Sequence, residues 1–497
     1  MPVFDLIEEP WIPALSVDGH RGLASLRSLL EAPGNWRTIE AENPVECLAL
    51  YRLLLAICHR AIGPGDEAQR LSLVETWPSG AVTRYLAAWK AGFDLFDSGR
   101  PFMQVPALRS VKELMRGPWT RIAFDRASGN AKRLWDHSRD ADPPQLEFAS
   151  AARILVAHLQ FTPGGLVKAL RTAGSAGPAT SLLLSMPLGR NLGETLALSL
   201  LPQTAAEFAV DLPAWEAAAP DIALLKAGVP IVPQGPAARY TWLSRAILYL
   251  PTAEGLSNIL YAAGMVAAPS PVPDPMSASY TFKGEVRNLL LREDRALWRD
   301  FHALAGASGC KASAVLEHAA KLRFALDNYD PIDLIVGGLQ PDQMTLVLWR
   351  LEERRVSPRL LEKGGAVLAA LENAIQLADK AGQGLFAALG RLAADWLQQV
   401  GGNPPSQAAV SEVRNRTQAI ERFWGSLEPA YWRFVSALGG LQTIEVALGD
   451  WRGALEAGLR AGWLQATEAL GTDARALAAA ASAHRRLAAT IAEVRKG

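Results

Sequence analysis

The sequence predicts an α+β protein in which a mixed α/β domain is followed by a C-terminal four-helix bundle. Up to about residue 357, short strand-like apolar runs alternate with helical segments and with turns rich in glycine or proline. From about residue 358, alanine and leucine dominate with a period of 3.6 residues, and breakers at 401–405, 439–440 and 471 cut the tail into four long helices. The expected domains are therefore residues 1–357 and 358–497.

The first domain opens with a hairpin and a buried helix. Asp18 and Gly19 separate two short runs, which favours a tight turn between strands. The apolar segment "CLALYRLLLAICHRAIG" is interrupted by charged residues, so we expect a core helix rather than a membrane span. Asn43, Pro44 and Glu46 suit its cap, its first turn and a capping box.

Local patterns also predict the later elements of this domain. "SAARILVAHLQF", "NLGETLALSLLP" and "LREDRALWRDFHALA" are helical, and "SLLLSMPL" is strand-like. "RYTWLSRAILYLPTAEGLSNILYAAGMV" indicates two strands around a turn at Thr252 to Gly255. The polar segment "DRASGNAKRLWDHSRDADPPQLEF" predicts a long exposed loop, and such loops in compact domains are usually functional or disordered.

The stretch "LIVGGLQPDQMTLVLWRLEERR", residues 334–355, is the most unusual local sequence. An apolar run ends at Gly337 and Gly338, polar residues follow, and a helical pattern begins at Met344. The local prediction is a sharp turn with a helix behind it, with Pro341 in the first helical turn and Asp342 placed to cap it. The helix would carry basic residues at spacings of about one turn, namely Arg350, Arg354 and Arg355.

The composition excludes several classes of protein. The 497 residues are 49% hydrophobic and 20% charged, which is ordinary for a folded soluble protein. The formal net charge is +0 and the isoelectric point is about 7.1, which disfavours a free-standing DNA-binding protein. The three cysteines form no CxxC pair, so we expect free thiols in a reducing cytosol and no structural zinc. The N-terminal sequence lacks the features of a signal peptide, so a cytoplasmic protein is expected.

No catalytic motif is visible. The histidines form no HxxxH or HExxH pair. Asp136 and His137 stand beside Ser138, but a triad must converge in space from different elements. The run "GGLVKALR" lacks P-loop spacing, although Gly164 and Gly165 at a helix start would let a backbone approach a phosphate. We therefore expect a binding subunit rather than an enzyme, with no metal, no cofactor and no catalytic residue.

Seven blocks of sequence together resemble one known family. They are "FDLIEEPWIPAL", "RPFMQV", "FTPGGL", "DPMSASYTFKGE", "EDRALWRDFHAL", "GGLQPDQ" and "FWGSLEPAYWRF". In this order, and over nearly the whole chain, they resemble the CasA-type large subunit of type I-E CRISPR surveillance complexes (Cascade), which also ends in a four-helix bundle.

The resemblance implies a non-catalytic subunit that sits at the crRNA 5′ handle beside other Cascade subunits. It would read the protospacer-adjacent motif (PAM) on double-stranded DNA, begin strand separation and help recruit a helicase–nuclease. Sequence specificity would belong to the guide RNA.

The family's site residues fall on defined positions of this chain. By resemblance, the wedge that enters the duplex is Gln343 with its neighbour Asp342, supported by the turn at Gly337 and Gly338. The glycine loop that approaches the PAM minor groove falls on Gly164 and Gly165. The loop that docks on the crRNA handle and on neighbouring subunits spans about residues 126–142 and includes Trp135, Asp136 and His137. Expected contacts to DNA phosphates are Lys168, Arg350, Arg354 and Arg355.

One feature of some family members does not transfer, and two other interpretations stay open. The turn "PTAEGLSN" contains no lysine where those members place a lysine finger, so the PAM preference is expected to differ. An α/β hydrolase-like enzyme with a helical appendage would use Asp136, His137 and the glycine loop. An assembly scaffold would make no contact with DNA at all.

Overall fold

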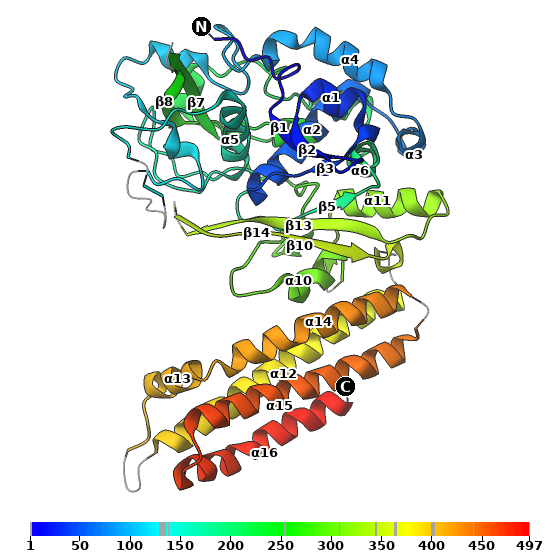
Figure 1. Cartoon of the computed structure of the whole chain (residues 1–497), viewed down its shortest axis with the longest axis vertical. Coiled ribbons are helices and arrows are strands. Elements are labelled where there is room, and N and C mark those ends of the chain that lie inside the picture. Colours follow the sequence, from blue (N-terminus) through cyan, green and yellow to red (C-terminus); the bar gives the residue numbers. More distant parts are fainter. Residues whose placement is uncertain are drawn as a thin grey trace. The chain divides into compact units, whose positions relative to one another are not determined.

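A computed structural model describes residues 2–128, 136–137, 139–252, 255–307, 309–342, 345–361, 365–398, 403–440 and 442–496. The chain divides into two compact units (Figure 1). The first contains residues 1–294 and 310–355, and the second contains residues 295–309 and 356–497. The second unit thus starts beside the boundary predicted at 357. It also contains residues 295–309, which were predicted from the sequence to belong to the first domain.

The first unit begins with a small antiparallel sheet and a buried helix. The sheet has the order β2-β1-β3, from β1 (Ile12–Ser16), β2 (Arg21–Ala24) and β3 (Trp36–Ile39). The hairpin predicted at Asp18 and Gly19 is confirmed. Helix α2 (Pro44–Ile62) is largely buried, and the Asn43 side chain accepts hydrogen bonds from the first-turn N–H groups, as predicted. Glu46, predicted to close a capping box, pairs instead with Arg153 at 3.5 Å.

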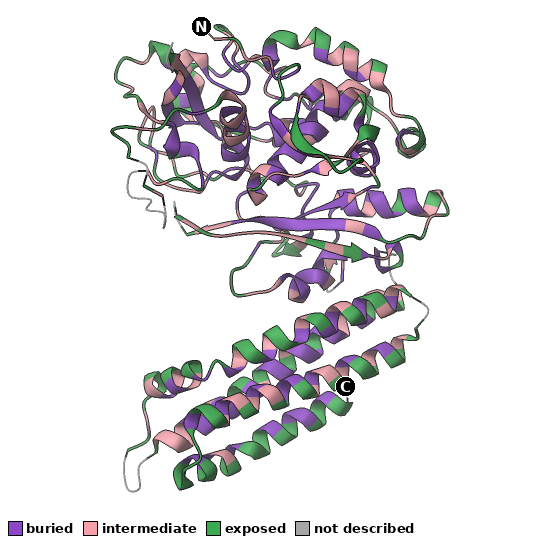
Figure 2. Cartoon of the chain, in the orientation of Figure 1, coloured by how far each residue is buried: buried purple, intermediate pink, exposed green. Residues whose placement is uncertain are grey.

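The other helices of this unit surround the same core, which Figure 2 shows as buried residues concentrated in α2, α5 and the β7–β8 pair. They are α1 (Leu26–Glu31), α3 (Glu67–Glu75), α4 (Ser79–Ala88), α5 (Phe148–Phe161), α6 (Leu192–Ser199), α7 (Ala205–Val210), α8 (Ile222–Ala227), α9 (Pro236–Tyr240) and α11 (Ala314–Ala325). Short 3₁₀ turns are η1 (Pro33–Asn35), η2 (Lys90–Phe93), η3 (Pro106–Ser110) and η4 (Trp119–Ile122).

Four further small sheets complete the first unit. The two strands predicted around residues 252–255 are present as β7 (Arg245–Thr252) and β8 (Gly255–Ala263), in the order β4-β8-β7 with β4 (Gly117–Pro118). The other sheets are β14-β13-β5, β11-β10-β12 and the parallel pair β6-β9. Their strands are β5 (Leu184–Leu188), β6 (Pro230–Ile231), β9 (Val266–Ala267), β10 (Ser279–Phe282), β11 (Glu285–Asn288), β12 (Cys310–Lys311), β13 (Ile332–Asp342) and β14 (Thr345–Val356).

A fully buried ion pair joins distant parts of this unit. The Arg52 guanidinium, on α2, donates to both carboxylate oxygens of Asp274 at 3.0 and 2.9 Å, and neither side chain is exposed. Its Nε donates to Gln160 of α5 at 2.8 Å, and it lies over the Tyr240 ring of α9. Burial alone would raise the pKa of Asp274, but the charge and hydrogen bonds of Arg52 lower it. The carboxylate is therefore held ionised in the core.

The second unit is the predicted helical bundle, and the fold class is confirmed. Its long helices are α12 (Ala366–Leu397), α14 (Ala419–Gly439), α15 (Ile444–Leu470) and α16 (Ala474–Lys496), with α14 against α15 and α12 against α16. Smaller elements are α10 (Leu297–Leu304), η5 (Pro358–Leu361) and α13 (Gln407–Arg416). Among the residues described, no helix is both long enough and apolar enough to cross a lipid bilayer.

Helix α10 belongs to this bundle although it precedes the rest of it by some fifty residues of chain. The Trp298 side chain is 1% exposed. Its ring lies 5.1 Å from that of Tyr431 and 6.0 Å from that of Trp451, centroid to centroid. Arg299 pairs with Asp379 at 2.9 Å. The aromatic core of the bundle is thus completed by a helix from an earlier part of the chain.

Candidate functional site

The stretch 334–355 forms a long β-hairpin, so the predicted turn and helix are wrong. Gly337 and Gly338 lie inside β13, and residues from Thr345 onward form β14. Strand β13 pairs with β5, with Ile335 opposite Met186. Helix propensities among such residues differ by only about 0.7 kcal/mol, and strand pairing plus packing of Trp349 on the core outweighs them. The β-branched and aromatic residues of "TLVLW" were the sequence signal for a strand.

The two glycines allow backbones to approach one another closely. A Cβ on Gly337 would overlap the carbonyl oxygen of Arg350 on β14. A Cβ on Gly338 would overlap the carbonyl oxygen of Leu182. Neither residue has positive φ. Their role is close packing of the sheet, and not the turn expected from the sequence.

Of the two residues predicted as a wedge, the structure describes only Asp342. Asp342 is the last residue of β13 and is exposed. No helix follows it in the described residues, so the predicted capping role is wrong. Gln343 lies outside the described residues, and its role stays a prediction.

The three predicted phosphate-binding arginines lie on β14 rather than on a helix, and each faces a carboxylate. Arg350 and Arg354 both pair with Glu352. Arg355, whose side chain is 70% exposed, pairs with Asp333 at 2.7 Å, and hydrogen bonding to that carboxylate raises the pKa of Arg355. A phosphate would have to compete with these carboxylates.

The predicted glycine loop is also not helical at its start, because α5 ends at Phe161 and an irregular segment follows. The 1%-exposed Arg245 holds both arms of this segment. Its guanidinium donates to the carbonyl oxygens of Pro163 at 3.1 Å and of Ser175 at 2.8 Å. Gly164 and Gly165 are half-buried.

The segment that follows the glycine loop contacts the hairpin, although the two are far apart in sequence. The Ser181 N–H, beyond the glycine-rich segment, donates to the Leu339 carbonyl of β13 at 2.9 Å. Leu182 lies against Gly338, as described above. Lys168, predicted to contact phosphate, is exposed within the loop. The structure thus places the segment that follows the glycine loop against β13.

A buried histidine anchors the first residue of this loop. The His158 Nε2 lies 2.6 Å from Oγ1 of Thr162. Burial, followed by repulsion from Arg245 and Arg121, lowers the pKa of His158 to about 3. The unfolded-state value is about 6.5. The stability that comes from holding this imidazole neutral is therefore present above pH 6.5 and is lost as pH falls toward 3.

The variant His158→Gln is expected to have a weaker dependence of stability on pH. Unfolding at acid pH takes up one extra proton at His158, which contributes about 1.4 kcal/mol per pH unit. Urea unfolding between pH 6 and pH 4 should show a slope smaller by about that amount in the variant. His20→Gln, at an exposed position, is the matched control. Equal slopes in the wild type and H158Q would contradict the assignment.

The predicted docking loop is described only at its ends. Asp136 accepts from the Ala127 N–H and pairs with Arg126 at 3.5 Å, and His137 is exposed. Trp135 and Ser138 lie outside the described residues. Within the part of the chain that is described, no three His, Cys, Asp or Glu side chains are placed to hold a metal ion.

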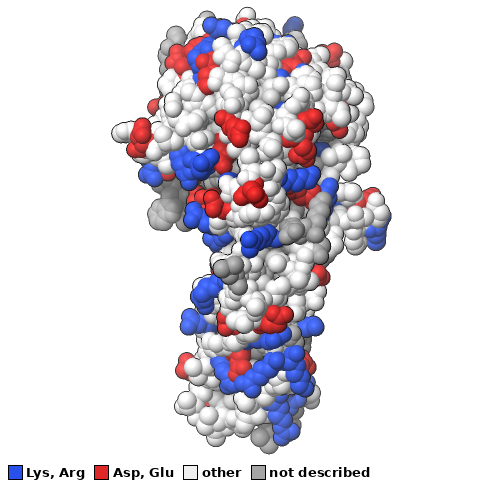
Figure 3. Space-filling view, turned by 90° about the vertical axis from the view of Figure 1, so that its right-hand side faces the viewer, with Lys and Arg blue, Asp and Glu red and all other residues white. Residues whose placement is uncertain are grey.

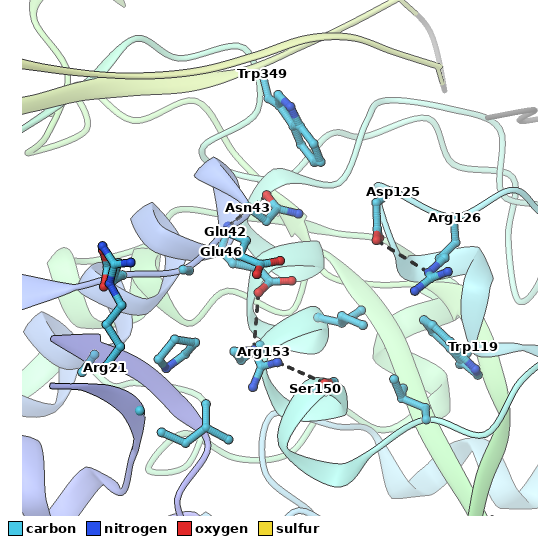
Figure 4. A pocket seen from close by; sticks show the side chains of 18 residues that line it. Arg21, Glu42, Asn43, Glu46, Trp119, Asp125, Arg126, Ser150, Arg153 and Trp349 are labelled. Carbon is cyan, nitrogen blue, oxygen red and sulfur yellow. Dashed lines mark hydrogen bonds and ion pairs between the residues drawn. The ribbon is translucent and has the colours of Figure 1, made fainter. Parts of the chain in front are cut away.

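A pocket of about 900 Å³ in the first unit was not found from the sequence (Figure 4). Its polar lining comes from segments around residues 21, 40–46, 125–126 and 150–153. Trp349 points into it from β14, and Trp119 borders it on another side. No local motif signals it, because these residues meet only in the folded chain.

Charges of both signs are spread over the molecule. Figure 3 shows Lys and Arg mixed with Asp and Glu over the first unit, and a gathering of Lys and Arg over one face of the bundle. Exposed arginines of the bundle include Arg416, Arg422, Arg485 and Arg486. The basic surface is therefore local, as the neutral net charge requires.

Comparison with known proteins gives matches along nearly the whole chain. Residues 5–474 match the family described as CRISPR-associated protein Cse1. The chain is 31% identical to CRISPR-associated protein CasA/Cse1 of Thermus thermophilus, over 99% of this chain and 98% of that protein. The crystal structure of CasA from Thermus thermophilus superposes with a TM-score of 0.86 at 28% identity, covering 99% of this chain and 100% of that one. A chain of a solved CRISPR RNA-guided surveillance complex superposes with a TM-score of 0.75 at 23% identity, covering 100% and 99%.

Proposed function

Because the chain belongs to the CRISPR-associated Cse1 family, we propose that it is the non-catalytic large subunit of an RNA-guided surveillance complex. In this role it recognises the PAM on double-stranded DNA and opens the duplex to start R-loop formation. It also docks on the crRNA 5′ handle and neighbouring Cascade subunits, and helps recruit a helicase–nuclease in the cytoplasm. The guide RNA supplies the target sequence.

The observation that best supports this proposal is the contact between the hairpin and the segment that follows the glycine loop. A PAM reader and a strand separator must act on neighbouring base pairs, so they must lie side by side on the protein. Ser181, in the segment that follows the glycine loop, donates to Leu339 of β13. Arg245 fixes the other arm of the same loop. A loop held in this way keeps a constant position relative to the hairpin.

A glycine loop suits reading of the minor groove. That groove distinguishes mainly A·T from G·C pairs, because guanine alone adds an exocyclic amine there. The half-buried backbone at Gly164 and Gly165 has no side chain to keep it out of a narrow groove, and it would be blocked by that amine. Such a reader excludes some sequences and accepts several others.

A wedge at the hairpin end suits the opening of the first base pair. Separating one base-pair step costs about 1.4 kcal/mol. The side chain of Gln343, the residue that follows β13 in the sequence, can donate or accept hydrogen bonds with either exposed base. The backing is a three-stranded sheet, β14-β13-β5, and not the helix that the sequence suggested.

The variant Gln343→Ala is expected to assemble normally but to form R-loops on duplex targets about tenfold less well. The factor follows from losing contacts that offset about one base-pair step. Binding of the reconstituted complex to a duplex target and to a target pre-melted beside the PAM should be compared. Gln234→Ala, at an exposed loop position distant in sequence, is the control. Equal losses on both targets would rule out the wedge, and unchanged duplex opening would do the same.

Crosslinking distinguishes the proposed function from that of an assembly scaffold that makes no contact with DNA. In the complex bound to a PAM-containing duplex, crosslinks from DNA should reach the glycine loop around residues 164–168. Their absence, with crosslinks only to other subunits, would favour the scaffold.

A further inference from the structure

The pocket of about 900 Å³ in the first unit has no part in reading or opening DNA as proposed above. Its lining combines three arginines with four carboxylates, Glu40, Glu42, Glu46 and Asp125, and two tryptophans. Figure 4 shows Glu42 and Glu46 pointing into the space from the start of α2, with Asp125 across from them. Its volume lies near the upper end of the range for small-molecule sites, about 300–1,000 Å³. It has room for more than one side chain.

Each arginine of the lining already has a carboxylate partner. Arg21 pairs with Glu40 at 2.8 Å. Arg126 pairs with Asp125 at 3.6 Å. Arg153 pairs with Glu46 at 3.5 Å, and it also donates to the Trp11 carbonyl and to Ser150. An incoming phosphate would have to displace carboxylates to reach any of these cations.

The carboxylates, in contrast, exceed the cations. Glu42 makes no ion pair with any residue that the structure describes. The Glu46 side chain is only 17% exposed. Its pKa is raised, first by burial and then by the nearby Asp125 and Glu42 carboxylates, against the opposing charge of Arg153. The pocket therefore carries one carboxylate more than it has arginines, and a bound cation would relieve the repulsion among its carboxylates.

The tryptophans give the pocket apolar walls. The Trp119 indole N–H donates to the Pro144 carbonyl at 2.7 Å, which fixes that ring. Trp349 enters from another side, on β14 (Figure 4). Indole faces accept the methylene stem of lysine or arginine, and they attract its charged head.

We propose that this pocket binds a lysine- or arginine-bearing loop of a neighbouring protein subunit. Glu42, Glu46 and Asp125 accept from the cationic head groups, and Trp119 and Trp349 pack on the stems. The proposal rests on the proposed function only in taking the neighbour to be a subunit of the same complex. It assigns the pocket to protein and not to nucleic acid.

Photocrosslinking within the assembled complex tests this assignment. The full chain carrying p-benzoylphenylalanine in place of Trp349 is reconstituted with its partner subunits and guide RNA, irradiated and analysed by mass spectrometry. The expected product joins position 349 to a segment of another protein subunit that contains lysine or arginine. A product with the guide RNA alone, or no product beyond this chain itself, would overturn the proposal.

Charge reversal gives an independent readout. Glu42 is exposed, so E42K should leave the thermal unfolding midpoint unchanged, yet it should weaken incorporation of the chain into the complex at least about tenfold at low salt. Glu75→Lys, exposed at the end of α3, is the matched control and should assemble normally. Tighter assembly of E42K would indicate a phosphate occupant, and unchanged assembly would also contradict the proposal.

The pocket proposal and the wedge proposal can be rejected independently of one another. E42K complexes that do assemble should open duplex targets as the wild type does, since Gln343 is intact. A protein crosslink at position 349 combined with normal duplex opening by Q343A would retain the pocket and reject the wedge.

Discussion

Replacing Asp274 with alanine is expected to lower the free energy of unfolding by about 3–5 kcal/mol. The change leaves the Arg52 guanidinium, which is not exposed at all, without the two oxygens that accept from it at 3.0 and 2.9 Å. The remaining Gln160 contact cannot balance a buried charge. Urea unfolding measures the loss as a shift of the midpoint.

A double variant separates the cost of an unpaired buried Arg52 charge from the loss of the Arg52–Asp274 ion pair itself. In Arg52→Met with Asp274→Ala no charge remains buried, so part of the stability should return relative to D274A. Glu75→Ala, at an exposed position, should stay within about 0.5 kcal/mol of the wild type. A D274A midpoint equal to that of E75A would show that the pair contributes nothing.

The same variant should also weaken DNA opening. Asp274 accepts from the Met276 N–H, and the Met276 carbonyl in turn accepts from Ser185 on β5. Strand β5 pairs with β13, the first strand of the hairpin. Loosening this chain of contacts removes support from the proposed wedge, so D274A should open duplex targets less well than pre-melted ones.

The variant Gly337→Ala is expected to destabilise the first unit by about 3 kcal/mol, at the upper end of overpacking costs. Its Cβ would overlap the Arg350 carbonyl oxygen, and a backbone atom cannot rotate away as a side chain can. One of the strands β13 and β14 would have to shift. Thermal and urea unfolding measure the effect on stability.

A second strand glycine provides the control for this variant. Gly22 lies in β2, and nothing stands within 4 Å of where its Cβ would be. G22A should therefore remain within about 0.5 kcal/mol of the wild type. In the complex, G337A should lose duplex opening although Gln343 is intact, and should retain binding to a pre-melted target. Equal stability of G337A and G22A would refute the close-approach role.

The sequence was sufficient to predict those elements whose structure depends on residues close to one another in the chain. Asn43 accepts from the first N–H groups of α2, and Asp18 with Gly19 closes the first hairpin. The breakers at residues 401–405, 439–440 and 471 separate the long helices of the bundle. In each case the residues that determine the structure are within a few positions of one another.

The hairpin at 332–356 could not be predicted in this way, because one of the two strands that β13 pairs with, β5, is far away in sequence. Leu334 to Val336 pair with residues 185–187. The glycines that looked like a turn are required by the carbonyls of Leu182 and Arg350. Without these partners in view, the leucines, glutamates and arginines of β14 favour a helix, as their intrinsic propensities do.

Only part of the candidate site could be predicted from the sequence, for the same reason. The family resemblance placed Gly164 and Gly165 on a loop, but the sequence contained no sign that Arg245 holds it. The pocket combines residues from widely separated parts of the chain, between Pro13 and Trp349. Its surplus of carboxylate is a property of the folded arrangement alone.

The placement of α10 determines how the bundle could be produced as a separate fragment. The chain passes between its two units three times, after residues 294, 309 and 355. A fragment that begins at residue 356 would lack Trp298 and would uncover the sides of Tyr431 and Trp451 on which Trp298 packs. An autonomous bundle therefore requires residues 295–309 to be joined to it, for example through a designed linker to its N-terminus. A single proteolytic cut near residue 356 would leave the two products associated through α10.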